Sequence, residues 1–397
     1  MTLTIISGAR PNFMKIAPLC RSLDAAREQG ADIRYRIVYT GPEDDPNLEP
    51  SLYSDLGMRR PDACLGVSGT GQTEVTVGVM QAFERELDAH PAQVVLVVDD
   101  FTATMSCAIV AKKRGLRLAH VIAGTRSFDM NMPREVNRTI VDALSDYLFT
   151  AGMAANRNLN MEGMIPDYIH YVGNILMDNL RYNRHRFLRP SWFTALGLHA
   201  GHYLLLTLNR RRLTESPGLL RPLLEALLRG SGDLPIMAPL HAYAARAVSE
   251  LALENKRLSH NDGAYAPGDG AYTHDDSAYA LGTNSRLHLL PPQSYLHFGW
   301  LVEHARGIVT DSGNIAEEAT FLDVPCITLN TYAEHPETWR MGTNTLVGED
   351  PARLSAALTR LLSADRPHAT LPDRWDGRTA DRIVQTLLHE ESSARKA

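Results

Sequence analysis

The chain begins with TLTIISGARPNFMKIAPL (residues 2–19), a short apolar run followed by the start of a helix. Residues 3–6 predict a buried strand, and the Ser-Gly pair after them predicts a turn into a helix near Arg10. Apolar strands separated by helices are typical of parallel sheets covered on both faces. This stretch therefore predicts an α/β fold built on parallel strands.

The strand-and-helix pattern repeats along the chain and restarts once, after a Pro- and Trp-containing break at residues 186–201. The predicted strands cover residues 3–6, 34–39, 94–98, 116–122, 147–150, 203–208, 234–238, 286–290, 307–310 and 325–329. We predict two Rossmann-like, doubly wound parallel-sheet domains, 1–185 and 186–375, in a GT-B-like arrangement with a ligand cleft between them. A C-terminal helix, 376–397, is expected to pack back on the first domain.

Residues 262–282 interrupt the second domain with a repeated seven-residue unit, DGAYAPG, DGAYTHD and DSAYALG. Its Gly, Asp, Pro and Ala content favours an inserted surface loop, which we place at 258–283. The alternative is a lid or a subunit contact anchored by the tyrosines.

Composition narrows the class of protein. At 397 residues with 44% hydrophobic and 22% charged residues, the sequence is that of a globular protein of two domains. A net charge of -6 gives no field that would attract nucleic acid. No apolar run reaches the ~20 residues of a membrane span, and the four scattered cysteines indicate buried free thiols. We expect a cytoplasmic protein.

Two strand-to-helix turns carry groups suited to a diphosphate. Arg10 and Lys15 lie at the first turn, where the N–H groups of a helix start and two cations would face one anion. The second turn, TDSGNIAEE (310–318), would bring the backbone of Ser312 and Gly313 close to phosphate. Glu318 could accept hydrogen bonds from ribose hydroxyls.

A third motif, PPQSYLHF (291–298), supplies groups for a base. The amide of Gln293 could read a base edge, and Phe298 could pack against a pocket wall. An aromatic residue of this kind is also common in a core.

These motifs, with HVIAGTRSFDMNMPREVNRT, YVGN and EHPET, resemble in order and spacing the non-hydrolysing UDP-N-acetylglucosamine 2-epimerase family over almost the whole chain. The resemblance implies two Rossmann-like domains, a homodimer, and interconversion of UDP-GlcNAc and UDP-ManNAc without a redox cofactor or metal. At two pocket positions the chain departs from the family pattern, with Asn314 for a glycine and His335 for an arginine. The nucleotide-binding positions it implies are Arg10, Lys15, Gln293, Phe298, Ser312, Gly313 and Glu318.

The resemblance also implies four acid–base positions, of which this chain keeps one, Asp100. Two glutamates are replaced by Ile122 and Arg134, and a histidine by Asn209. Isoleucine cannot move a proton, arginine stays protonated, and asparagine does not titrate near neutrality. Losing one such group often costs about two to four orders of magnitude in rate, so losing three should abolish the usual mechanism unless substitutes exist.

Asp99, Glu135, His120 and His241 lie in or beside these motifs and are the candidate substitutes. Each also has a structural interpretation: Glu135 pairs with Arg138 on its helix, His120 ends a buried strand, and His241 serves a helix start.

Arg134 falls in the first turn of a helix, where the dipole disfavours a cation, so an anionic partner is expected. The partner is either Asp129 or Glu135, or a carboxylate or phosphate of a ligand. Arg211 and its arginine neighbours could extend such a patch or form a solvated face.

Three functions remain open at this point. In the first, the chain is an epimerase that uses replacement residues or acts on a different nucleotide sugar. In the second, it is a glycosyltransferase-like enzyme in which Asp100 is the base for an acceptor. The third possibility is a catalytically silent UDP-sugar-binding partner protein.

Overall fold

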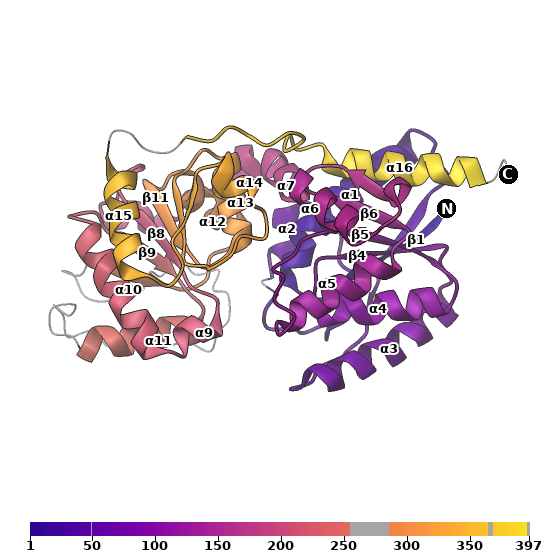
Figure 1. The fold of residues 1–397 in the computed structure, drawn as a ribbon, viewed down its shortest axis with the longest axis horizontal. Coiled ribbons are helices and arrows are strands. Elements are labelled where there is room, and N and C mark those ends of the chain that lie inside the picture. The colour runs from indigo at the N-terminus through magenta and orange to yellow at the C-terminus, as the bar shows by residue number, and fades with distance from the viewer. Residues whose placement is uncertain (49, 255–285, 364–367, 395–397) are drawn as a thin grey trace. The chain divides into compact units, whose positions relative to one another are not determined.

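The computed structural model describes residues 1–48, 50–254, 286–363 and 368–394, which divide into two α/β units (Figure 1). Unit 1 combines Met1–Leu48, Leu52–Tyr182 and Asp373–Ala397, and unit 2 combines Glu49–Ser51 with Asn183–Pro372. The C-terminal segment thus belongs to unit 1. The repeated DGAY segment lies outside the described residues.

Unit 1 is built on a seven-stranded parallel sheet in the order β3-β2-β1-β4-β5-β6-β7. The register places Ile5 of β1 opposite Ile37 of β2 on one side and Leu96 of β4 on the other. Its strands are β1 (Thr2–Ser7), β2 (Arg34–Tyr39), β3 (Ala63–Cys64), β4 (Val94–Val98), β5 (Arg117–Val121), β6 (Tyr147–Thr150) and β7 (Ile169–Tyr171).

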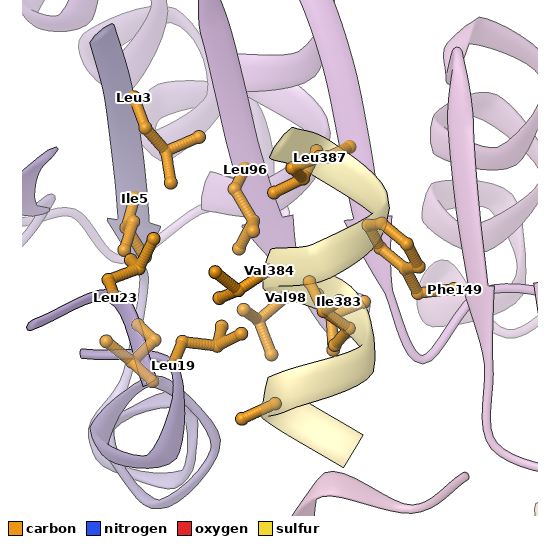
Figure 2. Packing of buried hydrophobic residues seen from close by; sticks show 14 of the residues in the cluster. Leu3, Ile5, Leu19, Leu23, Leu96, Val98, Phe149, Ile383, Val384 and Leu387 are labelled. Atoms are coloured by element: carbon orange, nitrogen blue, oxygen red, sulfur yellow. The ribbon is translucent and has the colours of Figure 1, made fainter. Parts of the chain in front are cut away.

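Helices cover this sheet on both faces, because successive strand side chains point to opposite sides and both sets are apolar. They are α1 (Arg10–Glu28), α2 (Leu52–Leu56), α3 (Gln72–Ala89), α4 (Thr102–Lys113), α5 (Pro133–Leu144), α6 (Met153–Met161), α7 (Ile175–Asn183), α16 (Thr379–Ala394) and the 3-10 turn η1 (Pro166–Tyr168). Figure 2 shows α16 packing Ile383, Val384 and Leu387 against the strands beside α1. Val95 and Val97 pack into the opposite layer, with α3 and α4.

Unit 2 holds a six-stranded parallel sheet in the order β10-β9-β8-β11-β12-β13. Its strands are β8 (Leu204–Thr207), β9 (Ile236–Pro239), β10 (Leu287–Leu290), β11 (Gly307–Thr310), β12 (Cys326–Thr328) and β13 (Asn344–Leu346). Its helices are α8 (Ser191–Ala195), α9 (Arg211–Thr214), α10 (Pro217–Gly230), α11 (Ala242–Glu254), α12 (Tyr295–Glu303), α13 (Gly313–Phe321), α14 (Glu337–Arg340), α15 (Pro351–Leu362) and the 3-10 turn η2 (Arg184–Arg186).

Local chemistry explains where these elements begin. Asp350 accepts hydrogen bonds from the backbone N–H groups of Ala352 and Arg353 and so caps α15, with Pro351 at the first helical position.

On one face of the unit 2 sheet, leucines of α10 and α15 form a buried cluster with alternate strand residues. Phe193 packs edge-on against Trp300 at 4.7 Å between ring centres.

In both sheets the strand order reverses beside the first strand of the unit. The reversal falls between β1 and β4 in unit 1 and between β8 and β11 in unit 2. Ligands of open α/β sheets bind outside the carboxyl ends of the strands at such a switch point. The predicted fold class of two doubly wound parallel-sheet units is confirmed.

One cysteine departs from the expectation that all four thiols are buried. Cys64 is exposed rather than buried, because β3 pairs with β2 alone at the sheet edge. Within the described ranges, no helix is long and apolar enough to cross a membrane.

Candidate functional site

At the switch point of unit 1, the side chain of Asn12, in the first turn of α1, binds the backbone of the turn that follows β1. Its Oδ1 accepts hydrogen bonds from the N–H groups of Gly8 (2.8 Å) and Ala9 (3.3 Å), and its Nδ2 donates to Asp99 Oδ2 at 2.8 Å. Gly8 is required here, since a Cβ would lie 2.7 Å from the Cβ of Ala103 in α4. The backbone N–H groups of Gly8 and Ala9 are therefore already bound by the protein.

Lys15 is buried, and its ammonium forms an ion pair with Asp99. Asp99 has a φ of +59°, a left-handed conformation that places its carboxylate toward α1. Arg10, at the start of α1, is half-buried. The lysine predicted for a diphosphate thus contributes to the structure of the switch point, whereas Arg10 keeps part of its surface exposed.

His120 is buried at the end of β5 with both ring nitrogens engaged. Nδ1 lies 2.6 Å from Asp142 Oδ1 and Nε2 lies 2.9 Å from the carbonyl oxygen of Asp99. A carbonyl can only accept, so Nε2 carries a proton and cannot take one from a substrate.

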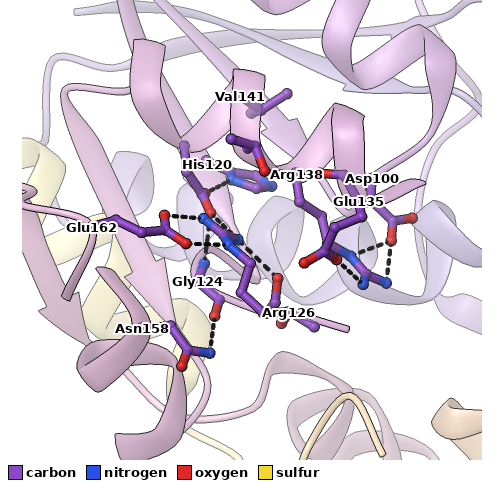
Figure 3. A network of polar contacts seen from close by, with 12 residues as sticks. Asp100, His120, Gly124, Arg126, Glu135, Arg138, Val141, Asn158 and Glu162 are labelled. Atoms are coloured by element: carbon purple, nitrogen blue, oxygen red, sulfur yellow. Dashed lines mark hydrogen bonds and ion pairs between the residues drawn. The ribbon is translucent and has the colours of Figure 1, made fainter. Parts of the chain in front are cut away.

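Asp142 belongs to a buried polar network with His120, Gly124 and Arg126, and these three residues are labelled in Figure 3. Asp142 Oδ2 accepts from Gly124 N at 3.0 Å and from Arg126 Nη1 at 2.7 Å, and Arg126 also binds Glu162. Burial acts to raise the pKa of Asp142, but His120 and Arg126 outweigh it and hold that pKa below its usual value. The network fixes the segment after β5 to α5 and α6.

Asp100, for which the resemblance implies an acid–base role, is buried beside Arg138 of α5 (Figure 3). Nε and Nη2 of Arg138 lie 2.7 and 2.6 Å from Asp100 Oδ2. Nη1 of the same arginine lies 3.0 Å from Glu135 Oε2, which confirms the expected pair of Glu135 with Arg138. Asn137 donates to the Asp100 carbonyl at 2.8 Å.

Glu135 is further held by the loop that precedes α5. Its carboxylate accepts from Ser127 N, Ser127 Oγ and Phe128 N, each at 2.9 Å. Although burial acts to raise the pKa of Glu135, these donors and Arg138 hold it below its usual value. Glu135 therefore serves to fix the loop.

Two positions at which the resemblance implies a replaced group are Ile122, directly after β5, and Arg134, in the first turn of α5. Ile122 has a φ of +72°, a strained conformation for a β-branched residue, and its side chain is nearly buried. Arg134 Nη1 lies 3.4 Å from Asp100 Oδ1, and its guanidinium lies 4.7 Å from the centre of the Phe101 ring. The partner of Arg134 is thus Asp100, and neither Asp129 nor Glu135 as sequence proximity suggested.

The switch point of unit 2 is organised by Asp311, which follows β11. Its carboxylate accepts from Asn209 N at 2.9 and 2.8 Å and from Arg210 N at 2.7 Å, so it fixes the turn after β8. Burial raises the pKa of Asp311 in spite of these donors. Ser312, the residue before α13, donates its N–H to Thr310 Oγ1 at 3.0 Å.

The other predicted nucleotide residues of unit 2 lie on three segments. Gln293 Nε2 donates to Pro291 O at 2.8 Å, and Phe298 is half-buried on α12. Gly313, Asn314 and Glu318 lie on α13. His335 is buried, with Nε2 3.7 Å from Glu317 Oε1.

The remaining candidates of unit 2 lie near β8 and β9. His241 precedes α11 and stacks on Tyr243, with ring centres 6.1 Å apart. Arg211 is exposed and pairs with Glu215 at 3.2 Å.

The structure therefore brings Lys15 to Asp99, and Arg134 to Asp100, in unit 1. In unit 2 it brings the backbone of Asn209 to Asp311, which precedes Ser312. Sequence reasoning missed Asn12 and the contact of Arg138 with Asp100. For Arg138 a signal existed, since residues 134 and 138 lie one helical turn apart and share a face. Among the described residues, no group of three or more His, Cys, Asp or Glu side chains is placed to hold a metal ion.

Two doubly wound units with polar switch points define a protein of the GT-B-like, Rossmann-type class. A model of the UDP-N-acetylglucosamine 2-epimerase family matches residues 25–388. The UDP-N-acetylglucosamine 2-epimerase of Methanocaldococcus jannaschii is 30% identical over 400 residues, covering 98% of this chain and 99% of that protein. The chain belongs to the UDP-N-acetylglucosamine 2-epimerase family.

Two further comparisons agree with this assignment. The crystal structure of the M. jannaschii enzyme in complex with UDP-GlcNAc and UDP matches with a TM-score of 0.81, covering 98% of this chain and 100% of that one at 30% identity. The UDP-2,3-diacetamido-2,3-dideoxy-D-glucuronate 2-epimerase of Pseudomonas aeruginosa is 29% identical over 351 residues, 88% of each chain.

Proposed function

We propose that this chain binds a UDP-sugar and does not epimerise it at carbon 2. The nucleotide positions implied by the family resemblance are present: Arg10, Lys15, Gln293, Phe298, Ser312, Gly313 and Glu318. The relative of known structure was crystallised with UDP-GlcNAc and UDP, which supports a UDP-linked sugar as the ligand.

One observation carries the second half of the proposal. The acidic groups around the unit 1 switch point are already bound by cations or N–H donors: Asp99 by Lys15, and Asp100 and Glu135 by Arg138. A proton taken up by Asp100 would weaken a buried ion pair, which is energetically costly. His120 cannot serve instead, because its Nε2 already carries a proton.

The same ion pair bears on the transferase alternative. An inverting transferase needs a base for its acceptor, and Asp100 was the candidate. With Arg138 on one carboxylate oxygen and Arg134 near the other, this carboxylate is better suited to orienting arginines than to removing a proton. The homodimer and the cytoplasmic location implied at first remain predictions.

Calorimetric titration with UDP and UDP-GlcNAc tests the binding, and chromatography of the same mixtures tests the reaction. We expect measurable binding of both ligands, with no UDP-ManNAc and no free UDP formed. The matched control is Ser312→Trp, which should block binding at the start of α13. Formation of UDP-ManNAc by the wild-type chain would overturn the proposal, as would the absence of UDP binding.

A further inference from the structure

Arg134 occupies an electrostatically unfavourable position. It lies in the first turn of α5, where the positive end of the helix dipole disfavours a cation by some tenths of a kcal/mol. Its acidic neighbour in sequence, Glu135, is bound to Arg138 and to the Ser127–Phe128 backbone. Glu135 therefore does not neutralise Arg134, and we look to another anion to stabilise the guanidinium at this position.

Asp100 supplies this anion only in part. Arg138 lies at 2.6 and 2.7 Å from Oδ2, whereas Arg134 reaches Oδ1 at the longer distance of 3.4 Å. The Arg134 side chain is 52% exposed, against 3% for Arg138. The inner arginine thus neutralises the buried carboxylate, and the outer one faces solvent.

The outer guanidinium is nonetheless held in place. The ring of Phe101 lies 4.7 Å from it, and Asp100 contacts one of its nitrogens. A guanidinium supported by a ring and a carboxylate presents its other N–H groups in a fixed fork, which matches the two oxygens of an oxyanion. Phe101 and Arg134 follow β4 and β5, at the edge where ligands of open α/β sheets bind.

We propose that Arg134 recognises a carboxylate on the sugar, so that the ligand is a UDP-linked hexuronate. This inference rests on the proposed function, because it assumes that a UDP-sugar binds. A phosphate of UDP has the same oxyanion chemistry as a carboxylate, and the binding of UDP alone to Arg134→Gln distinguishes the two sources.

UDP-glucuronate and UDP-glucose form a matched pair of probes, since they differ only in a carboxylate against a hydroxymethyl group. Calorimetric titration of the wild-type chain should show UDP-glucuronate binding at least about tenfold more tightly, as expected for one charge-assisted hydrogen-bonded pair. Arg134→Gln should remove this preference and leave the affinity for UDP within about twofold. Arg134→Lys should keep part of it.

Arg246→Gln is the control, because Arg246 is an exposed helical arginine of unit 2, paired with Glu250. It should leave all three affinities unchanged. Equal wild-type affinities for the two sugars would overturn the proposal. So would an equal loss of UDP and UDP-glucuronate binding in Arg134→Gln, which would assign Arg134 to the diphosphate. If UDP itself failed to bind the wild-type chain, the proposed function would fall together with this inference.

Discussion

Arg138 Nη2 lies 2.6 Å from Asp100 Oδ2, and the same guanidinium reaches Glu135 Oε2 at 3.0 Å through Nη1. One buried cation thus joins Asp100 to Glu135, whose carboxylate orders the loop before α5. This arrangement makes Asp100 part of a structural network. Because the buried Arg138 balances the charge of Asp100, Arg134 can remain half-exposed.

Arg138→Met is expected to destabilise unit 1 strongly. It leaves two buried carboxylates without their shared cation, and removing one partner of a buried pair typically costs about 3–5 kcal/mol. Urea unfolding followed by circular dichroism measures the change. The triple variant Arg138→Met, Asp100→Asn, Glu135→Gln should recover much of the loss, and Arg246→Met should stay within about 0.5 kcal/mol of wild type. A small effect of Arg138→Met alone would contradict this account.

Asp178 predicts a specific pH dependence. Burial raises its pKa to about 6, although it accepts N–H bonds from Thr379 (3.0 Å) and Ala380 (2.8 Å) at the start of α16. An acid with a raised folded-state pKa contributes stability that is full below about pH 4 and is lost as pH rises through about 6. A shift of about two pKa units corresponds to about 3 kcal/mol.

Asp178→Asn keeps an acceptor for these N–H groups but cannot titrate. Its unfolding free energy, relative to wild type, should therefore rise by up to about 3 kcal/mol between pH 4 and pH 7. Asp44→Asn, at an exposed position, should run parallel to wild type throughout. Parallel curves for Asp178→Asn and wild type would show that this carboxyl is not the source of the pH dependence.

Asp311 is expected to matter for both stability and binding in unit 2. Asp311→Ala removes a buried carboxylate and leaves the N–H groups of Asn209 and Arg210 without their acceptor, at a cost of about 1–3 kcal/mol. Asp311→Asn retains one acceptor oxygen and should cost less. Thermal unfolding and UDP titration of both variants measure the effects. Indistinguishable Ala and Asn variants would argue against the hydrogen bonds as the cause.

Much of the fold could be predicted from hydrophobic pattern alone. Residues 94–98 are five apolar residues in a row, and the observed β4 has the same limits. Strands β3, β7 and β13 were not predicted, because two or three residues at a sheet edge leave no recognisable pattern. Motifs suggested candidate positions such as Asp100 and Arg134, but the contact between these two side chains could not be predicted from sequence.

Lys15 and Arg134 show why the contacts were out of reach. Sequence places Lys15 at a helix start, but its partner Asp99 is 84 residues away and is brought near by the pairing of β1 with β4. For Arg134, proximity in sequence favoured Asp129 or Glu135 as the partner within the protein. The parallel pairing of β4 with β5 supplies Asp100 instead.

Restoring the family's groups should restore its chemistry if the scaffold is intact. We expect the triple variant Ile122→Glu, Arg134→Glu, Asn209→His to interconvert UDP-GlcNAc and UDP-ManNAc detectably. Each single substitution should remain inactive, because acid–base groups that act together are strongly non-additive. Product analysis by chromatography is the measurement. An inactive triple variant that still folds and binds UDP would mean that further positions have diverged.

We expect this chain to hold a UDP-sugar without abstracting the proton at carbon 2. Proton NMR of the purified chain with UDP-GlcNAc in heavy water is the decisive measurement, because exchange at carbon 2 reports abstraction even where no net epimerisation accumulates. We expect an unchanged carbon 2 signal under conditions where UDP-GlcNAc binding is measurable. Loss of that signal, with UDP-ManNAc appearing, would contradict this expectation.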